Sequence, residues 1–341
     1  MRWTSMKWMR KTALAALLSA LLILAGCAPR EASRTLFAMD TAVTMTAYGD
    51  AAEAGLAAAG EVLTDLEARL SVTRADSEIA RLNERGAETL SDTALAVLSR
   101  ALSAAEATGG AFDPTVYPMV RTWGFFTKEY RVPDAGELDS LRAAGTFRDV
   151  RAEGGTVTLA PGMAVDLGGI AKGYAADAMA DALGRAGVTS AILSLGGNVR
   201  ALGEKPDGSA WRVGIRDPNK PDANAAVARI RDCSVVTSGS YQRFFTGEDG
   251  TVYHHILDPE TGYPVQNELL SVTVFSSDGA LADAYATALF VMGKDGALAF
   301  WREQRGFEVL LMTKNGEMIA TEGLRDVLGD VSPDYTLVWA S

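Results

Sequence analysis

The spacing of apolar residues separates predicted helices from predicted strands along this chain. Between Leu56 and Leu70, apolar side chains recur every three or four residues in an alanine-rich stretch, which predicts an amphipathic helix over 51–70. Ser91 stands where the N-cap of another helix is expected. Helices are predicted over residues 51–70, 77–83, 91–108, 170–186 and 280–292.

Alternating or short continuous apolar stretches predict the strands. One alternating segment covers 35–48, and a short strand pair over 156–159 and 164–167 ends at a Gly-Gly turn. Residues 109–133 form a loop-rich stretch. Further strands are predicted over 191–193, 211–215, 226–231, 234–237, 269–275 and 308–312. Because hairpins are mixed with helix pairs, this order favours an α+β fold over a doubly wound sheet.

The N-terminus has the charge and hydropathy pattern of a secretory leader. Four basic residues precede an apolar run over 13–25, which is shorter than the roughly 20 residues of a membrane span. The run ends in Leu24-Ala25-Gly26-Cys27, which resembles the bacterial lipobox, whose cysteine is diacylated and becomes the first residue. An ordinary signal peptide with a chance cysteine, or an uncleaved anchor, is the alternative. We expect a leader over 1–26, a lipidated linker over 27–34 and one domain over 35–341, held at a membrane outside the cytoplasm.

The net charge and the cysteine content of the chain limit the binding partners and the disulfides that are expected. The formal net charge is −11, and loss of the leader with Arg2, Lys7, Arg10 and Lys11 would make it about −15. Such an acidic chain is not expected to bind nucleic acid or anionic lipid as its main partner. Once Cys27 is lipidated, Cys233 has no partner for an intramolecular disulfide. Cys233 lies in an apolar, strand-like stretch, which favours a small buried residue over a nucleophile.

A Gly-Gly turn before a predicted helix forms the first group of residues that suggests chemistry. Asp166-Leu167-Gly168-Gly169 leads into Ile170-Ala171-Lys172, so backbone groups and the Lys172 ammonium meet at a helix start. Helix N-termini favour phosphate oxygens because their first N–H groups have no helical partner. Taken alone, this segment is equally explained as a tight turn.

A carboxylate and a hydroxyl share one face of the predicted 280–292 helix. Asp283 and Thr287 are four residues apart, which places them one turn apart on the same side. Oxygen ligands of this kind suit Mg²⁺, which also recruits carbonyls, waters and phosphates. The alternative is a solvated aspartate beside a threonine that bonds back to its own helix.

The two histidines of the chain, His254 and His255, are adjacent. On a strand, adjacent side chains face opposite ways, so at most one of them points into a given site and a zinc pair is not expected. One histidine near its usual pKa could act as a general base. A structural or surface role is the alternative.

Two smaller segments accompany these groups. Ser194-Leu195-Gly196-Gly197-Asn198 is a second glycine-rich turn after a strand. Ala111-Phe112-Asp113-Pro114 precedes Trp123-Gly124-Phe125 and places aromatic surface beside an aspartate. Either could be loop and core packing.

Together these segments resemble the ApbE family, the FAD:protein FMN transferases, over most of the chain that follows the leader. The family's fold is expected: T-fold-related mixed sheets with helices, in two lobes around one active site. The segments that carry the resemblance are Phe37-Ala38-Met39-Asp40-Thr41, Ser77-Glu78-Ile79, Ala111-Phe112-Asp113-Pro114, Asp166 to Gly173, Ser194 to Asn198, Thr237-Ser238-Gly239, His255-Ile256-Leu257-Asp258-Pro259 and Asp283 to Thr287.

The resemblance implies a reaction and a set of roles. Such enzymes cleave the FAD pyrophosphate, release AMP and join FMN by a phosphoester to a Thr or Ser of another protein. Phosphoryl transfer of this kind needs a metal that neutralises phosphate charge. By resemblance, Asp283, Thr287 and the Gly169 carbonyl hold Mg²⁺, and His255 and Asp283 are the catalytic residues, with His255 as base for the acceptor hydroxyl. The implied FAD site is lined by Met39, Ala111, Phe112, Asp113, Asp166, Lys172 and Leu257.

One departure and two alternatives remain. Family members often place an aromatic residue shortly before the Ser-Glu-Ile segment, but this chain reads Ser71-Val72-Thr73-Arg74 there. Flavin stacking would then come from Tyr241, Trp123 or elsewhere, or flavin affinity would be reduced. The alternatives are an FAD pyrophosphatase, in which water replaces the acceptor, and a non-catalytic flavin-binding lipoprotein.

The acceptor is expected to be another, extracytoplasmic protein, such as a membrane redox subunit. Family acceptors carry a motif of the form Asp-Gly/Ala-x-Ser/Thr-x-Ala/Ser-Thr/Ser. Asp278-Gly279-Ala280-Leu281 and Asp207-Gly208-Ser209-Ala210 both lack the required hydroxyl, so self-modification is not expected.

Overall fold

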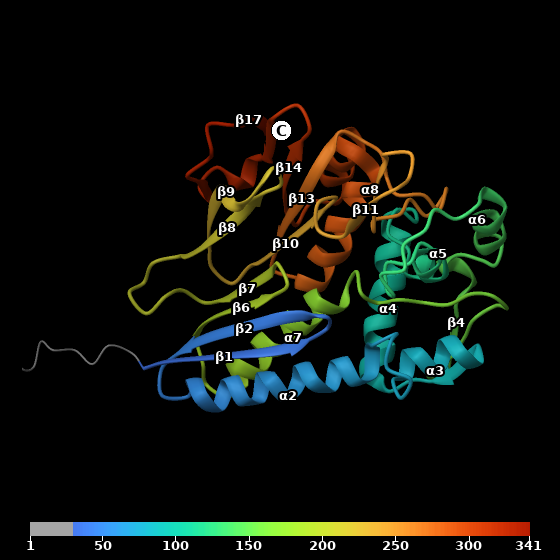
Figure 1. The fold of residues 1–341 in the computed structure, drawn as a ribbon. Coiled ribbons are helices and arrows are strands. Elements are labelled where there is room, and N and C mark those ends of the chain that lie inside the picture. Colours follow the sequence, from blue (N-terminus) through green and yellow to red (C-terminus); the bar gives the residue numbers. More distant parts are fainter. Residues whose placement is uncertain (1–29) are drawn as a thin grey trace, which may run out of the picture.

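The computed structural model describes residues 30–341, so the predicted leader and Cys27 lie outside the described residues. Its centre is a nine-stranded sheet with the order β1-β2-β6-β7-β10-β13-β14-β15-β17 (Figure 1). Neighbouring strands are antiparallel except for the parallel pair β15 and β17. The strands are β1 (Glu31–Ala38), β2 (Thr41–Tyr48), β6 (Ser190–Leu195), β7 (Asn198–Leu202), β10 (Ser234–Gly239), β13 (Leu269–Ser276), β14 (Glu308–Thr313), β15 (Glu317–Thr321) and β17 (Thr336–Ala340).

Three long helices cover one face of this sheet: α2 (Ala52–Leu70), α7 (Ala171–Arg185) and α8 (Gly279–Gln304). Gly55 lets α2 approach the segment between α7 and β6 closely, because a Cβ at Gly55 would lie 2.7 Å from Val188 Cγ2. The apolar sides of these helices and the inward residues of the sheet form the main core. Helix α8 is broken at Gly293, whose φ of 71° and ψ of −179° are not helical. The predicted helix end at 292 coincides with this break.

The opposite face of the nine-stranded sheet is covered in part by a three-stranded sheet with the order β16-β9-β8. These strands are β8 (Trp211–Asp217), β9 (Lys220–Ile230) and β16 (Leu328–Gly329). Strand β8 alternates buried and exposed residues, and its buried side chains form a second core with Phe275 and Met312 of the large sheet. Because one face of β8 packs on the large sheet and the other is exposed, the alternation of its residues fixes which face is inside.

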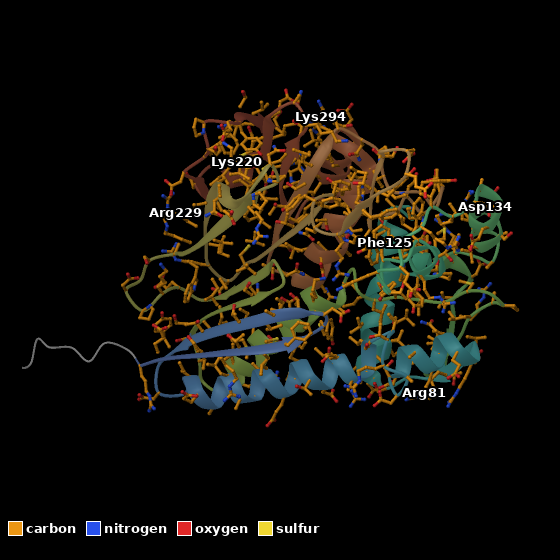
Figure 2. The ribbon with its side chains drawn as sticks, in the orientation of Figure 1. Arg81, Phe125, Asp134, Lys220, Arg229 and Lys294 are labelled. Atoms are coloured by element: carbon orange, nitrogen blue, oxygen red, sulfur yellow. The ribbon has the colours of Figure 1, made fainter. Side chains whose placement is uncertain are left out.

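The remaining segments form a small lobe beside the large sheet (Figure 1). Its third hydrophobic cluster combines Trp123, Phe125 and Leu257 with the β11–β12 hairpin. Phe125 and Asp134 lie in this lobe, while Lys220 and Arg229 lie at the far side of the molecule (Figure 2). The lobe contains α3 (Glu78–Arg85), β3 (Ala87–Thr89), α4 (Asp92–Ala107), η1 (Pro114–Val116), α5 (Tyr117–Thr122), α6 (Ala135–Arg142), η2 (Phe147–Asp149), β4 (Arg151–Glu153), β5 (Thr156–Thr158), β11 (Phe244–Thr246) and β12 (Val252–His254); a further 3₁₀ turn, η3 (Glu322–Leu324), follows β15.

The α+β fold with two lobes is confirmed, and most predicted helices and strands are present. Three local predictions are wrong. The single strand over 35–48 is the hairpin β1–β2, which turns at Met39 and Asp40 with positive φ, and Glu31–Arg34 belong to β1 and not to a linker. Residues 164–167 are not a strand, because Asn83 donates to Val165 O and accepts from Val165 N in place of a neighbouring strand.

Cys233 behaves as the sequence predicts. It is a free, half-buried thiol, and burial raises its pKa to about 11, which keeps it neutral and unreactive. Among residues 30–341, no helix is both long and apolar enough to cross a membrane.

Candidate active site

Helix α7 begins without a cap from its own chain segment. Its N-cap residue, Ile170, offers no side-chain hydrogen bond. The Gly173 N–H donates at 2.9 Å to Asp283 Oδ2 of α8, and not to the Gly169 carbonyl that a regular helix would supply. The Gly168 carbonyl accepts a 3.1 Å hydrogen bond from Lys172 Nζ. Within the described residues, the Gly169 carbonyl is therefore left without a donor.

The loop that leads into α7 is fixed from three sides. Asn83 of α3 bonds both backbone groups of Val165, and Asp166 N donates to Pro114 O at 2.8 Å. Gly169 lies against an aromatic ring, since a Cβ at this position would be 2.9 Å from Phe112 Cε2. The Gly-Gly segment is thus a close-packed turn that is held in place by α3, by the loop before η1 and by Phe112.

The side chain of Asp283 is almost completely buried, and the residue is 4% exposed. Its Oδ2 accepts from Gly173 N and lies 3.7 Å from Lys172 Nζ, while Oδ1 has no hydrogen-bond partner among the described residues. One turn further along α8, Thr287 Oγ1 lies 3.2 Å from Ser238 Oγ of β10. A buried carboxylate with one free oxygen, two hydroxyls and an unbonded carbonyl are all oxygen donors, and they fit Mg²⁺.

The described residues contain no cluster of three or more His, Cys, Asp or Glu side chains that could hold a metal by themselves. A cation at Asp283 would therefore take its remaining ligands from carbonyls, hydroxyls, water and phosphate. That ligand set is the usual one for Mg²⁺ in phosphoryl-transfer sites, which keeps several waters and binds substrate oxygens.

Positive charge surrounds this turn. Burial raises the pKa of the Asp166 carboxyl, while the Gly168 N–H and the cations Lys172 and Arg243 lower it. The carboxylate of Asp40 also raises this pKa, which places the β1–β2 turn near Asp166. Arg243 was not predicted from the sequence, because it is an exposed residue in a segment without a recognisable motif.

The two histidines face different surroundings, as predicted. His254 is buried, with Nε2 2.8 Å from Val265 O and its ring edge-to-face with Phe290. His255 lies on the site side, with Nδ1 3.3 Å from Arg243 O. The expectation of an ordinary pKa is wrong: burial first, and then the charge of Arg243, lower the pKa of His255 to about 3. His255 is therefore a neutral imidazole at neutral pH.

The other predicted flavin-site residues lie in the β1–β2 turn, in the loop before η1 and in the segment after β12. Met39 sits in the β1–β2 turn, held by its N–H bond of 2.8 Å to Glu67 Oε1. Asp113 is buried, and its Oδ1 accepts from Thr115 N at 2.7 Å while Oδ2 accepts from Phe147 N at 3.3 Å. The Asp113 carboxylate thus holds the loop of Ala111 and Phe112 in place. Leu257 is buried in the small-lobe core, two residues after His255.

Trp123 is not available for flavin stacking. It is 0% exposed, and its Nε1 donates to Gly262 O at 2.8 Å inside the small lobe. Tyr241, which is half-buried next to the end of β10, stays a candidate.

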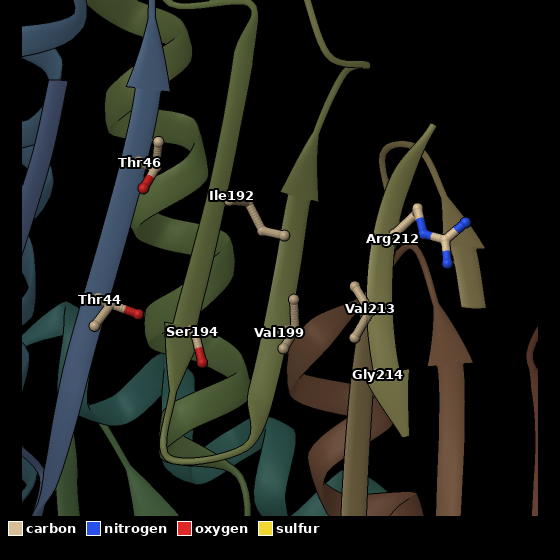
Figure 3. Close-up of a pocket in the computed structure, with 8 residues that line it drawn as sticks. All are labelled: Thr44, Thr46, Ile192, Ser194, Val199, Arg212, Val213 and Gly214. Atoms are coloured by element: carbon tan, nitrogen blue, oxygen red, sulfur yellow. The ribbon is translucent and has the colours of Figure 1, made fainter. Parts of the chain in front are cut away.

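A separate cavity of about 260 Å³ lies on the other face of the large sheet (Figure 3). Its floor is formed by β2, β6 and β7 and its wall by β8, so it is on the side of the sheet away from α7. None of the predicted site residues lines it. The lining residues are Thr44, Thr46, Ile192, Ser194, Val199, Arg212, Val213 and Gly214.

The start of α7 brings together an unbonded carbonyl, an ammonium, a buried carboxylate and hydroxyls. Such a combination is typical of an enzyme site that binds phosphate together with a cation. The chain belongs to the ApbE family, whose sequence model matches residues 39–311. The family's curated relatives are transferases, and so is this protein.

The similarity to individual relatives extends over most of the chain. It is 38% identical over 321 residues to the FAD:protein FMN transferase of Treponema pallidum, covering 87% of this chain and 88% of that one. It is 34% identical to the Klebsiella pneumoniae protein of the same name, covering 82% and 88%. The ApbE protein of Thermotoga maritima superposes with a TM-score of 0.81 at 30% identity, covering 87% of this chain and 98% of that one. The flavin transferase ApbE of Vibrio cholerae gives 0.76 at 30% identity, covering 89% and 96%.

Proposed function

We propose that the protein is a Mg²⁺-dependent FAD:protein FMN transferase, which moves FMN from FAD onto a Thr or Ser of another protein and releases AMP. The observation that supports this most is the start of α7, where Lys172 Nζ lies 3.7 Å from Asp283 Oδ2, Gly173 N donates to Asp283, and the Gly169 carbonyl has no donor among the described residues. We call this the open start of α7. The names of the relatives support the same reaction.

The chain's own residues suit the negatively charged phosphates of FAD and the Mg²⁺ ion that would bind with them. Lys172 would bind a phosphate oxygen beside the first N–H groups of α7, and its bond to Gly168 O holds the ammonium in place. Asp283, Thr287 and the Gly169 carbonyl would hold Mg²⁺, which when bound neutralises the charge that develops on the phosphates. Asp283 is buried and already bonded to Gly173 N, so it needs no reorganisation to bind the metal.

The acceptor hydroxyl attacks the FMN phosphorus, the bond to the AMP phosphate breaks, and the hydroxyl proton leaves. We assign that proton to His255. In the free protein the low pKa of about 3 makes His255 a weak base. Its cations, Arg243 and Lys172, are also where the pyrophosphate would bind, and an added anion raises the pKa of a nearby imidazole. Substrate binding would thus bring His255 closer to a useful basicity.

The flavin and adenine parts of FAD would lie along the turn of Met39 and the loop of Ala111, Phe112 and Asp113, with Asp166 and Leu257 at the border of the small lobe. Phe112 packs on Gly169, so a ligand at this ring is adjacent to the phosphate turn.

Mass spectrometry tests the proposal. A candidate acceptor is incubated with the protein, FAD and Mg²⁺, and a mass gain that matches FMN on a Thr or Ser is expected. Asp283→Ala should abolish it, while Asp295→Ala, an exposed aspartate later on the same helix, should not. Free FMN with an unmodified acceptor would instead indicate an FAD pyrophosphatase, and intact FAD in the presence of Mg²⁺ would contradict catalysis.

We also propose that the enzyme is anchored outside the cytoplasm by a lipid on Cys27, close to membrane redox subunits that act as acceptors. A tether raises the effective concentration of an acceptor on the same membrane. Cys27→Ser is expected to slow flavinylation in cells and to leave the purified protein fully active. Unchanged flavinylation in cells would contradict the role of the anchor.

A further inference from the structure

The starts of α7 and α8 lie against each other with no side chain between them. A Cβ at Gly173 would be 2.0 Å from Gly279 O, and a Cβ at Gly279 would be 2.8 Å from Gly173 O. Both distances are far below any real contact of a Cβ, so both positions require glycine. The two backbones therefore meet at these glycines, at the end of each helix where N–H groups have no helical acceptor.

Each helix supplies the acceptor that the other one lacks. Asp283 of α8 accepts from Gly173 N at 2.9 Å, and Asp177 of α7 accepts from Gly279 N at 2.7 Å and from Ala280 N at 3.2 Å. In both helices the aspartate comes four residues after the glycine, so each helix start carries the pattern Gly-x-x-x-Asp. The two patterns cap each other across the helix contact. We call this arrangement the reciprocal cap.

The two aspartates of the reciprocal cap differ in the cations that lie beside them. Asp283 faces Lys172 and belongs to the same helix face as Thr287. Asp177 faces away from that turn toward Arg200 of β7, whose Nε lies 3.5 Å from Asp177 Oδ1. Arg200 is a mostly buried side chain, which makes this an interior ion pair on the far side of the helix contact.

Buried polar atoms of and around the Asp177–Arg200 ion pair have no hydrogen-bond partner within the described residues. They are Asp177 Oδ1, the Nε and Nη1 of Arg200, and Ser234 Oγ. The Ser234 hydroxyl and Asp177 Oδ1 both lie 2.8 Å from the position of a Gly279 Cβ, so these groups converge on the start of α8. Buried polar groups that converge in this way are normally bridged by ordered water. The start of α8 thus lies against buried polar groups of β7 and β10 in the large sheet.

We propose that Asp177, backed by Arg200, is a positioning residue for Asp283: it docks the start of α8 on the start of α7 so that Asp283 and Thr287 face the Gly169 carbonyl. The inference rests on the proposed function in one respect, namely that these oxygens bind Mg²⁺. Asp177 itself lies outside the ligand set. It acts by fixing the helix on which two of the three ligands sit.

The size of the effect follows from how metal sites depend on their supporting groups. Removing a group that orients a metal ligand typically weakens metal binding about 10- to 100-fold. Helix α8 keeps its own N-cap, because Asp278 accepts from Leu281 N at 2.9 Å, so loss of Asp177 should undock the helix start without unwinding it. The expected result of Asp177→Ala is therefore weaker Mg²⁺ binding in a folded protein.

The test is calorimetric titration of MgCl₂ into the purified protein, with thermal unfolding of the metal-free samples measured in parallel. Asp177→Ala is expected to weaken Mg²⁺ binding about 10- to 100-fold. Asp177→Asn keeps an oxygen for Gly279 N–H but loses the charge that faces Arg200, so its loss should be smaller. Ser91→Ala removes the cap of α4 in the small lobe and serves as the control for a general loss of stability. It should lower the unfolding temperature without changing Mg²⁺ affinity.

Wild-type Mg²⁺ affinity in both Asp177 variants would overturn the inference, and so would an equal loss of affinity in Ser91→Ala. If Asp177→Ala does not fold, Asp177→Asn alone decides between these outcomes. If the wild-type protein itself binds no Mg²⁺, the metal site of the proposed function fails, and the inference fails with it. A protein that binds Mg²⁺ normally in every variant contradicts only the role of Asp177.

Discussion

Helices α4 and α7 begin in opposite ways. At α4, the N-cap residue Ser91 accepts from Ala94 N, and its own N–H donates to Glu78 of α3 at 2.6 Å, so this helix start has a conventional side-chain cap. At α7, Ile170 gives no cap, Gly173 N is served from another helix, and Gly169 O has no donor among the described residues. The closed start of α4 has a structural role only. The open start of α7 leaves polar groups for a ligand, and this contrast distinguishes the candidate site from the rest of the fold.

The open start depends on the contact between α7 and α8, and Gly173→Ala breaks it. The added Cβ would lie 2.0 Å from Gly279 O, so the helix starts must separate and Asp283 must move. We expect FAD cleavage to fall by at least about 100-fold and the free energy of unfolding to fall by about 1–3 kcal/mol.

The control is Gly184→Ala on the same helix, where a Cβ meets nothing within 4 Å. It should keep full activity and add about 0.5–1 kcal/mol of stability, as alanine usually does inside a helix. Denaturant unfolding and initial rates measure both variants. Full activity in Gly173→Ala would mean that the helix contact does not shape the site.

Lys172→Met removes the ammonium from the open start and keeps an apolar stem. A hydrogen bond to a charged group contributes about 1.5–3 kcal/mol, so FAD affinity should fall roughly 10- to 100-fold. Equilibrium dialysis of FAD measures this. Lys205→Met, in the turn after β7, is the matched control and should bind FAD as the wild type does. Equal affinities in both variants would remove Lys172 from the phosphate site.

The burial of His255, together with the positive charge of Arg243 beside it, predicts a pH effect on stability. Its pKa is about 3 in the folded protein against an ordinary 6.5, so only the unfolded chain binds this proton between those values. The free energy of unfolding should therefore fall as the pH is lowered from about 6.5 toward 3, and His255→Gln should fall less steeply. Urea unfolding at pH 7, 6 and 5 tests this. Parallel curves for both proteins would contradict the low pKa.

The closed start of α4 gives the smallest effect and completes the comparison. Ser91→Ala should cost about 1 kcal/mol of stability, the usual value of a lost N-cap. Its rate of FAD cleavage should not change, because the cap serves only the frame. A loss of rate as large as that of Gly173→Ala would contradict the distinction between the two helix starts.

This contrast also explains what the sequence could reveal. Ser91 and Ser77 act on neighbouring backbone groups, so local patterns predicted α3 and α4 correctly. Asp283 and Thr287 could be predicted to share one helix face because a helix fixes their spacing. By contrast, Asn83 acts on Val165, 82 residues away, and Asp177 caps a helix 102 residues away. No local pattern encodes such contacts, and for the same reason the 164–167 segment was wrongly predicted as a strand.

The low pKa of His255 was missed for a related reason. The sequence shows two adjacent histidines, but it does not show the burial of His255, or that Arg243, which directly precedes β11, lies beside it and carries no motif. The resemblance to the family supplied the predicted residues of the candidate site. The structure adds how their backbone neighbours hold them.

The most direct test of the open helix start is anomalous diffraction from crystals soaked with FAD and Mn²⁺ in place of Mg²⁺. We predict one anomalous peak bound by Asp283 Oδ1, Thr287 Oγ1 and the Gly169 carbonyl, with the FAD phosphates between that peak and Lys172. A peak or a pyrophosphate elsewhere, for example in the cavity on the opposite face of the sheet, would contradict it.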